Sequence, residues 1–354
     1  MKKLVKKISN ILLGILLLFF GLSISSCGDD QEEEKQETAF YNIHINNVIE
    51  LLDENKIKIQ FKLTDDEQIG VKGKTDDDFD VFEKVIGDDE DLTDPLEANR
   101  YIVPTPSSYA YASMIVMDLS GSVINDIEVI KSSSINYINN LFSNINSGNL
   151  KIGVYFFDGR TNLQEVIPFS SSQTDIIQAV ENMNQGLQQH IQTALYHGVS
   201  QSCDLMTNQL QNFYNNPDLT LYASSIVVFS DGQNSNYVGI DRNIMNAKIQ
   251  QTNTNTQFYC IAAGNDIDLN VVKNIGINGH FTITDYSKLN EGLNEVLGLI
   301  IREANSNYEL EFCTAKRGIN VSFRLKVKGF ETYQVGQNYF NTENFSEDII
   351  CTIN

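Results

Sequence analysis

Short apolar runs alternate with helical patterns from residue 107 to residue 305, and this alternation constrains the fold more than any other feature. Strands are predicted at 113–118, 151–157, 163–169, 225–230, 257–262 and 280–284. Helices are predicted at 127–145, 173–183, 192–213, 241–252, 268–275 and 287–303. Apolar strands that alternate with helices form a mostly parallel sheet covered on both faces. We therefore predict an α/β, doubly wound, Rossmann-like fold for this segment.

Oxygen-bearing side chains follow the predicted strands at three points. Segment 118–122 reads D-x-S-x-S at the end of the first strand, Thr193 opens the third helix, and Asp231 ends the next parallel strand. The carboxyl ends of such strands meet at one edge of the sheet, where ligands bind. Asp and Ser also cap helices, and Asp-Gly also forms turns. The joint occurrence of these residues in this order favours a site for Mg²⁺, Mn²⁺ or Ca²⁺, which prefer hard oxygen donors.

This segment resembles a von Willebrand factor A domain with a metal-ion-dependent adhesion site. The resemblance covers residues 107–305 and implies that one divalent ion is held by Asp118, Ser120, Ser122, Thr193 and Asp231. It also implies that an acidic side chain of a protein partner completes the coordination. The glycines that commonly flank the second-loop threonine are replaced by segment 188–192, with Gly186 further back, so the sequence does not fix the reach of Thr193.

The segments on either side of this domain show strand patterns. Apolar and polar positions alternate at 41–45, 57–63, 80–82, 308–312 and 320–327, and prolines mark a boundary near 104–106. We expect residues 39–105 and 306–354 to form one Ig-like β-sandwich into which the A domain is inserted. The alternative is two separate small β units.

The first residues read as a secretion signal. Four lysines between positions 2 and 7 precede an apolar run from 11 to about 24, shorter than the roughly 20 residues that a membrane span needs. Segment 24–27 reads Ile-Ser-Ser-Cys and resembles a bacterial lipobox, which implies removal of residues 1–26 and acylation of Cys27. The alternative is an ordinary signal peptide with an incidental cysteine.

Residues 27–38 are acidic and polar, so we expect a flexible tether. The acidic cluster after Cys27 resembles the surface-export signal of Bacteroidota lipoproteins. We therefore expect an outer-membrane lipoprotein exposed at the cell surface. The alternative is a solvated linker that faces the periplasm.

Four cysteines follow the lipobox, in a compartment that permits disulfides. No C-x-x-C pair occurs, so their spacing does not suit a zinc site. Cys313 and Cys351 lie in strand-like segments near the C-terminus, and we expect them to pair. Cys260 lies in an apolar strand, as a small buried hydrophobic residue would.

The charge of the chain restricts its partners. Removing residues 1–26, which hold four lysines and no acidic residue, takes the formal net charge from −21 to −25. Such a body repels nucleic acid and anionic lipid headgroups and attracts cations. We expect a non-enzymatic protein that binds a protein partner through its metal, in adhesion or in assembly of an envelope complex. The alternatives are an accessory subunit of an envelope transport or stress system and, more weakly, a metal-dependent hydrolase, for which no base or nucleophile is evident.

Overall fold

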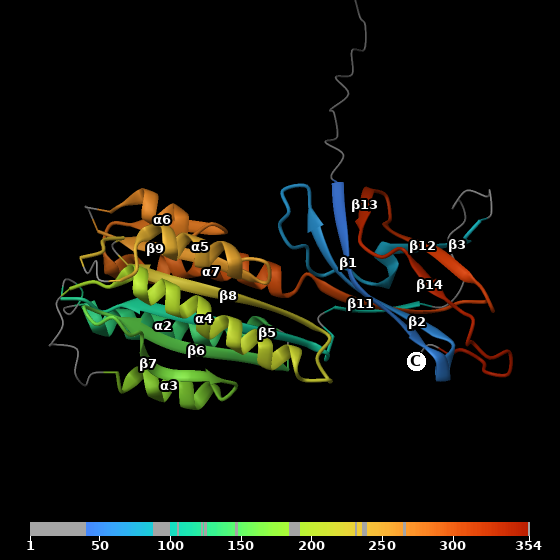
Figure 1. The fold of residues 1–354 in the computed structure, drawn as a ribbon, viewed down its shortest axis with the longest axis horizontal. Helices are drawn as coiled ribbons and strands as arrows, with labels where there is room; N and C mark the ends of the chain where they lie inside the picture. The colour runs from blue at the N-terminus through green and yellow to red at the C-terminus, as the bar shows by residue number, and fades with distance from the viewer. Residues whose placement is uncertain are drawn as a thin grey trace, which may run out of the picture. The chain divides into compact units, whose positions relative to one another are not determined.

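A computed structural model describes residues 40–87, 100–104, 106–121, 123, 126–145, 148–183, 192–230, 232–235, 239–264 and 267–352. The chain divides into two compact units, Met1–Thr38 and Ala39–Asn354. The description below concerns the second unit (Figure 1). The predicted signal, Cys27 and the tether lie outside the described residues.

A six-stranded sheet, sheet C, forms the α/β part of this unit. Its strand order is β10-β9-β8-β5-β6-β7, and every pair is parallel except β6 with β7. The strands are β5 (Tyr109–Asp118), β6 (Asn149–Phe157), β7 (Gln164–Ser170), β8 (Leu221–Ser230), β9 (Thr256–Ala263) and β10 (Gly279–Ile283). All ten residues of β5 are buried, as expected of a central strand covered on both faces. The doubly wound fold predicted from the sequence is therefore confirmed.

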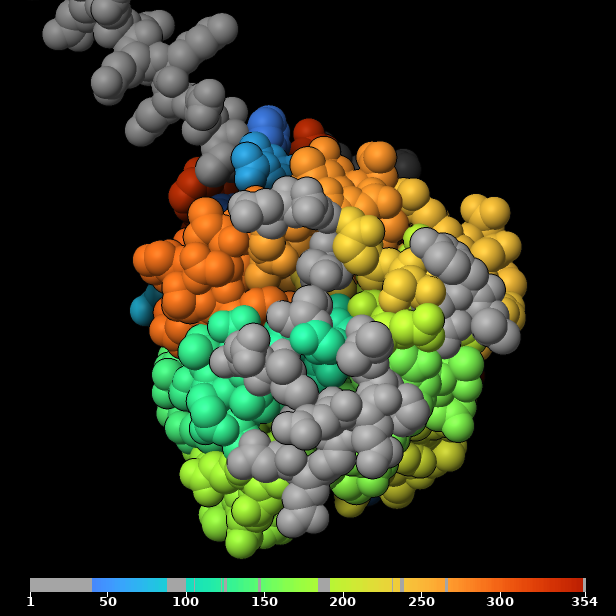
Figure 2. Space-filling model, turned by 90° about the vertical axis from the view of Figure 1, so that its left-hand side faces the viewer, coloured from blue at the N-terminus to red at the C-terminus, as the bar shows by residue number. Residues whose placement is uncertain are grey.

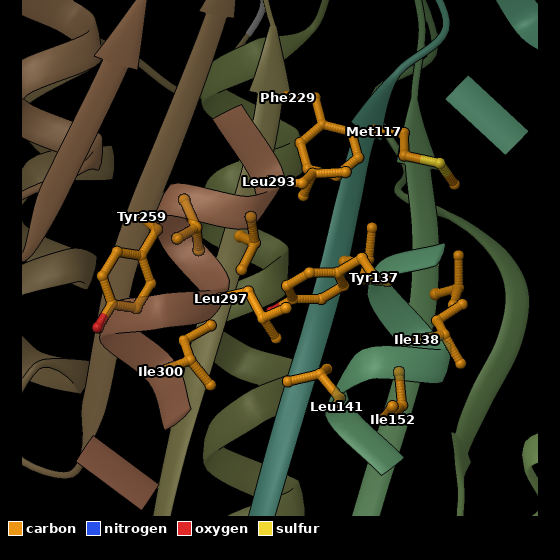
Figure 3. Close-up of a cluster of buried hydrophobic side chains, with 14 of the residues drawn as sticks. Met117, Tyr137, Ile138, Leu141, Ile152, Phe229, Tyr259, Leu293, Leu297 and Ile300 are labelled. Carbon is orange, nitrogen blue, oxygen red and sulfur yellow. The ribbon is translucent and has the colours of Figure 1, made fainter. Parts of the chain in front are cut away.

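Helices cover both faces of sheet C. They are α2 (Ile127–Asn144), α3 (Gln173–Glu181), α4 (Leu195–Tyr214), α5 (Arg242–Thr252), α6 (Leu269–Ile275) and α7 (Leu289–Ala304), with a 3₁₀ turn at Tyr286–Lys288. Side chains of α2, α3 and α7 form the core on one face, and those of α4, α5 and α6 form the core on the other. Figure 3 shows Leu293 of α7 beside Phe229 of the sheet, and Tyr137 of α2 pointing toward Leu297 of α7.

The segments before and after sheet C share two further sheets. The five-stranded sheet has the order β13-β1-β2-β11-β4, and the three-stranded sheet has the order β14-β12-β3. The strands are β1 (Phe40–Leu51), β2 (Lys56–Asp65), β3 (Phe79–Val85), β4 (Arg100–Pro104), β11 (Asn307–Cys313), β12 (Asn320–Val327), β13 (Glu331–Val335) and β14 (Tyr339–Asn341), and 3₁₀ turns lie at Leu52–Glu54 and Asp76–Asp78. Their buried side chains form one core. Both flanks thus contribute to each sheet, instead of forming two separate units.

The cysteines take two different environments. Cys313 and Cys351, the pair expected from the sequence, form a disulfide. Cys203 and Cys260 are buried free thiols, and burial raises the pKa of Cys260 to about 12, so this thiol stays protonated and inert. The C-terminal segment is also fastened by Asn55, whose Nδ2 donates to the carbonyls of Ser346 at 2.6 Å and Ile349 at 2.8 Å.

Within the described part of the chain, no helix is long and apolar enough to cross a membrane.

Glu83 on β3 leads to a prediction about pH. Its Oε2 accepts from Thr314 Oγ1 at 3.1 Å, its Oε1 is buried without a hydrogen-bond partner, and burial raises the pKa of this carboxyl to about 7. A carboxyl whose pKa is higher in the folded than in the unfolded state binds more protons when folded. Its cost to stability is therefore absent below about pH 4.5 and complete above about pH 7.

We expect Glu83→Gln to raise the free energy of unfolding by about 2–3 kcal/mol near pH 8 and to change it little near pH 4, as measured by urea denaturation. Glu331→Gln is the matched control, because Glu331 is exposed on β13, and it should change neither value. An equal effect of Glu83→Gln at both pH values would contradict the assignment.

Candidate functional site

The candidate site lies at the carboxyl edge of sheet C, where β5 and β8 end side by side. Met117 pairs with Phe229, so Asp118 and Ser230 are the next residues on two neighbouring strands. After β5 the chain continues to α2 on one face of the sheet, and after β8 it continues to α5 on the other. Such a divergence of connections opens the crevice in which doubly wound folds bind ligands. This edge lies on the left in Figure 1 and faces the viewer in Figure 2.

Asp118 is a buried carboxylate held on both oxygens. Its Oδ1 accepts from the backbone N–H of Ser120 at 3.0 Å, and its Oδ2 accepts from Ser230 Oγ at 2.9 Å. Asp118 is 0% exposed and Ser120 is 1% exposed. A buried carboxylate is costly unless hydrogen bonds or a cation compensate its charge. The structure therefore brings two of the predicted ligands together, with the Asp118 side chain in a fixed orientation.

Thr193 is fixed by the loop that follows β8. Its N–H donates to Ser235 Oγ at 2.8 Å, and its carbonyl accepts from the Ser235 N–H at 3.0 Å. The next residue, Ala194, donates its N–H to the carbonyl of Asp158 at 2.8 Å, in the loop after β6. Thr193 is itself buried and lies one residue before Ala194, the N-cap of α4. The expected flanking glycines are absent, and hydrogen bonds from the loops after β6 and β8 set the position of this threonine instead.

Ser122 and Asp231 lie outside the described residues. The five-residue metal site therefore remains a prediction, in which Asp118, Ser120 and Thr193 have known surroundings. Among the described residues, no group of three or more His, Cys, Asp or Glu side chains could hold a metal by itself.

The sequence did not point to four residues that shape this edge. Ser230 supports Asp118, and its Oγ also accepts from the Gly232 N–H at 3.0 Å. Ser235 holds Thr193, and Asn234 Oδ1 accepts from the Tyr196 N–H at 3.2 Å. Asp158 closes β6. Each of them lies within a few residues of a strand's carboxyl end, and this position is the signal that would have identified them.

A paired cation lies beside the candidate ligands. Asp158 is 1% exposed, and its Oδ2 accepts from Arg160 Nη2 at 2.6 Å and from Arg160 Nε at 3.0 Å. The guanidinium group lies 5.7 Å from the ring centroid of Phe156. The Arg160 side chain is 34% exposed, so a positive group fixed by its partner borders the edge. The negative charge of Asp158 is therefore neutralised by Arg160.

The donor set of Asp118, Ser120 and Thr193 fits a hard divalent cation. Each oxygen of a carboxylate has two lone pairs, so it can accept a hydrogen bond and still ligate a cation. A serine or threonine hydroxyl likewise keeps acceptor capacity while it donates. Oxygen donors of this kind select Mg²⁺, Mn²⁺ or Ca²⁺ over softer metals. The residues present are therefore chemically suited to the predicted ion.

Sheet C and its helices form a doubly wound α/β domain that is similar in fold to von Willebrand factor A domains. Residues 113–234 match the family model described as von Willebrand factor type A domain. This segment runs from β5 through the loop after β8 and so contains all five predicted ligands. No curated protein matches the chain.

Several solved structures are similar to parts of the chain. Proximal thread matrix protein 1 from the mussel byssus aligns at 16% identity with a TM-score of 0.45, covering 55% of this chain and 48% of that protein. The chain thus spans about half of the mussel protein's length. BatB from Bacteroides thetaiotaomicron, a conserved hypothetical protein, aligns at 16% identity with a TM-score of 0.42, covering 56% of this chain and 100% of BatB. A von Willebrand factor type A protein from Catenulispora acidiphila aligns at 11% identity with a TM-score of 0.43, covering 84% of this chain and 74% of the other.

The bond between Ser230 and Asp118 leads to a second prediction. Ser230→Ala removes a donor to a buried carboxylate, and we expect it to lower the free energy of unfolding by about 2–3 kcal/mol in the presence of EDTA. Ser225→Ala is the matched control, because this serine is also buried on β8 but donates to the neutral Ser113 hydroxyl at 3.2 Å. The control should cost about 1 kcal/mol in urea denaturation. Equal costs would show that Asp118 does not depend on Ser230.

Proposed function

We propose that the chain is a membrane-anchored lipoprotein that binds a protein partner through a divalent metal at the carboxyl edge of sheet C. The observation that carries the proposal is the buried Asp118 carboxylate, held in a fixed orientation at the end of β5 inside the segment that matches the von Willebrand factor A family. Asp118, Ser120, Ser122, Thr193 and Asp231 would hold the ion. The bound ion would offer a positive centre to an acidic side chain of the partner.

The hydrogen bonds of this edge prepare the residues for that role. Ser230 and the Ser120 N–H orient the Asp118 carboxylate before an ion arrives, which reduces the ordering that binding requires. Ser235 fixes Thr193 on the neighbouring loop in the same way. The protein thus presents the described donors from a rigid framework, as a tight and selective site requires.

The net charge of the chain explains why the binding of an acidic partner would depend on the metal. The chain has a formal net charge of −21, so an acidic partner is repelled at long range. A divalent ion at this edge would cancel the negative charges of Asp118 and Asp231 and would offer an open coordination position to a carboxylate. Binding to an acidic group should therefore vanish when the ion is removed, and should not be replaced by general electrostatic attraction.

Metal titration tests the site directly. We expect Mg²⁺ or Mn²⁺ to bind the chelator-stripped full chain saturably in calorimetry, and Asp118→Asn to weaken binding at least about tenfold, since it removes a charged ligand of nearly the same shape. Asp218→Asn is the control, because Asp218 is exposed in the turn before β8. Equal binding by both variants, or none by the wild type, would refute the metal site.

Partner binding is tested on the same two variants. Envelope proteins retained by the immobilised wild-type chain in Mg²⁺ should be released by EDTA, and the Asp118→Asn chain should not retain them. Retention that survives EDTA would place the binding surface elsewhere on the molecule.

The anchor is tested separately. Cys27→Ser should move the protein from the membrane fraction to the soluble fraction of the producing bacterium, because the acylated side chain would be lost. Ser26→Ala, which keeps a small residue before the cysteine, should leave the protein in the membrane fraction. Membrane retention of the Cys27→Ser chain would contradict lipid anchoring.

A further inference from the structure

We propose that a groove at the amino edge of sheet C binds a neutral oligosaccharide. The groove consists of two hollows of about 510 and 260 Å³ that share Tyr222, Thr254 and Asn255 in their walls. Small-molecule sites have volumes of about 300–1,000 Å³. The size of the groove therefore suits several linked sugar rings. We call it the amide-lined groove, after Asn253, Asn255 and Asn278 in its wall.

The lining of the larger hollow is polar and almost free of charge. Of its fifteen residues, ten are Asn, Gln, Ser or Thr. The two charged ones, Lys62 and Glu303, form an ion pair with each other. Pockets for ordinary small molecules are mostly apolar. Polar walls lose hydrogen bonds to water when an apolar ligand enters, and only a ligand rich in donors and acceptors offsets this loss.

Amide side chains match hydroxyl groups in particular. An Asn or Gln side chain offers two donor hydrogens on its nitrogen and an acceptor oxygen, and a sugar hydroxyl both donates and accepts. A phosphate or carboxylate ligand would instead need cationic partners, and the one lysine of the wall is already paired. The chemistry therefore selects a neutral polyhydroxylated ligand over an anionic one.

Several polar groups of the wall are set in place by the fold. Asn278 Oδ1 accepts from the Phe258 N–H at 2.8 Å, which fixes the plane of this side-chain amide. Ser224 Oγ donates to the Asn255 carbonyl at 3.0 Å and lies 2.8 Å from Thr256 Oγ1. These bonds join the start of β8 to the start of β9. A wall fixed in advance loses less conformational freedom when a ligand binds.

Two tyrosines give the groove an aromatic face. Tyr222 lines both hollows, and Tyr214, which is 68% exposed at the end of α4, lines the smaller one. Tyrosine combines an apolar ring with a polar tip, so it suits a ligand that is apolar on one side and wet on the other. A sugar ring has this character, because its C–H bonds form apolar faces and its hydroxyls point outward.

The groove is remote from the candidate metal site. It lies where β8 and β9 begin, whereas Asp118 and Ser230 lie where β5 and β8 end (Figure 1). The ten residues of β8 separate the two edges by about 30 Å at 3.3 Å per residue. A chelator should therefore not change oligosaccharide binding. The result of the binding test is independent of the function proposed above.

A panel of neutral hexasaccharides tests the groove: cellohexaose, maltohexaose, xylohexaose, mannohexaose and chitohexaose, with a sulfated hexasaccharide for comparison. We expect calorimetry on the full chain to detect at least one neutral member with a Kd between about 10 μM and 1 mM, unchanged by EDTA. Tyr222→Ala and Asn255→Asp should each weaken it at least about tenfold. Asn255→Asp preserves the shape of the side chain, so its loss of binding does not depend on the tyrosine variant folding.

Tyr333→Ala is the matched control, because this tyrosine is 58% exposed on β13 and lies outside both hollows. It should bind like the wild type. The proposal is overturned if no neutral member binds at about 5 mM, if both groove variants bind normally, or if only the sulfated member binds.

Discussion

The burial of sheet C on both faces decides where this chain can present polar chemistry. All ten residues of β5 are buried, and the cores on the two faces draw on helices from opposite sides. A strand in this position can expose functional groups only beyond its ends. The candidate metal ligands follow the carboxyl ends of β5 and β8, and the amide-lined groove borders the amino ends of β8 and β9. The same buried sheet thus holds two polar surfaces apart.

The charge of Asp118, at the end of β5, is compensated by groups outside its own strand. Asp118 is buried, and its charge is compensated by the Ser120 N–H and by the Ser230 hydroxyl of the adjacent strand. Asp158, one strand away, is compensated instead by Arg160. The two buried carboxylates at this edge are thus held by different groups: a backbone N–H and a hydroxyl donate to Asp118, and a guanidinium group donates to Asp158.

Local sequence patterns predicted most of sheet C, because apolar strands and amphipathic helices carry their own periodicity. They also predicted Asp118 at the end of a strand with Ser120 just beyond it, and the structure has both there. The Ser230–Asp118 bond was not predictable, since it joins residues 112 positions apart. Strands β4, β13 and β14 are short and take their places from distant partners, such as Phe40 beside Glu331 in the parallel β1–β13 pair. The amide-lined groove was missed for a related reason: Asn46, Asn255 and Asn278 are unremarkable until the fold gathers them.

The two sheets to which both flanking segments contribute have a consequence for the order in which the protein folds. Strand β2 needs β11 on one side, and β1 needs β13. These partners follow β10 in the chain, so every residue of sheet C is synthesised before the five-stranded sheet can close. Sheet C has all its strands in one continuous stretch and needs no such delay. The Cys313–Cys351 disulfide and the Asn55 bonds to Ser346 and Ile349 join the C-terminal segment to β11, which follows sheet C in the chain, and to the turn between β1 and β2, which precedes it. The five-stranded sheet can therefore close only when the segments made before and after sheet C are both present.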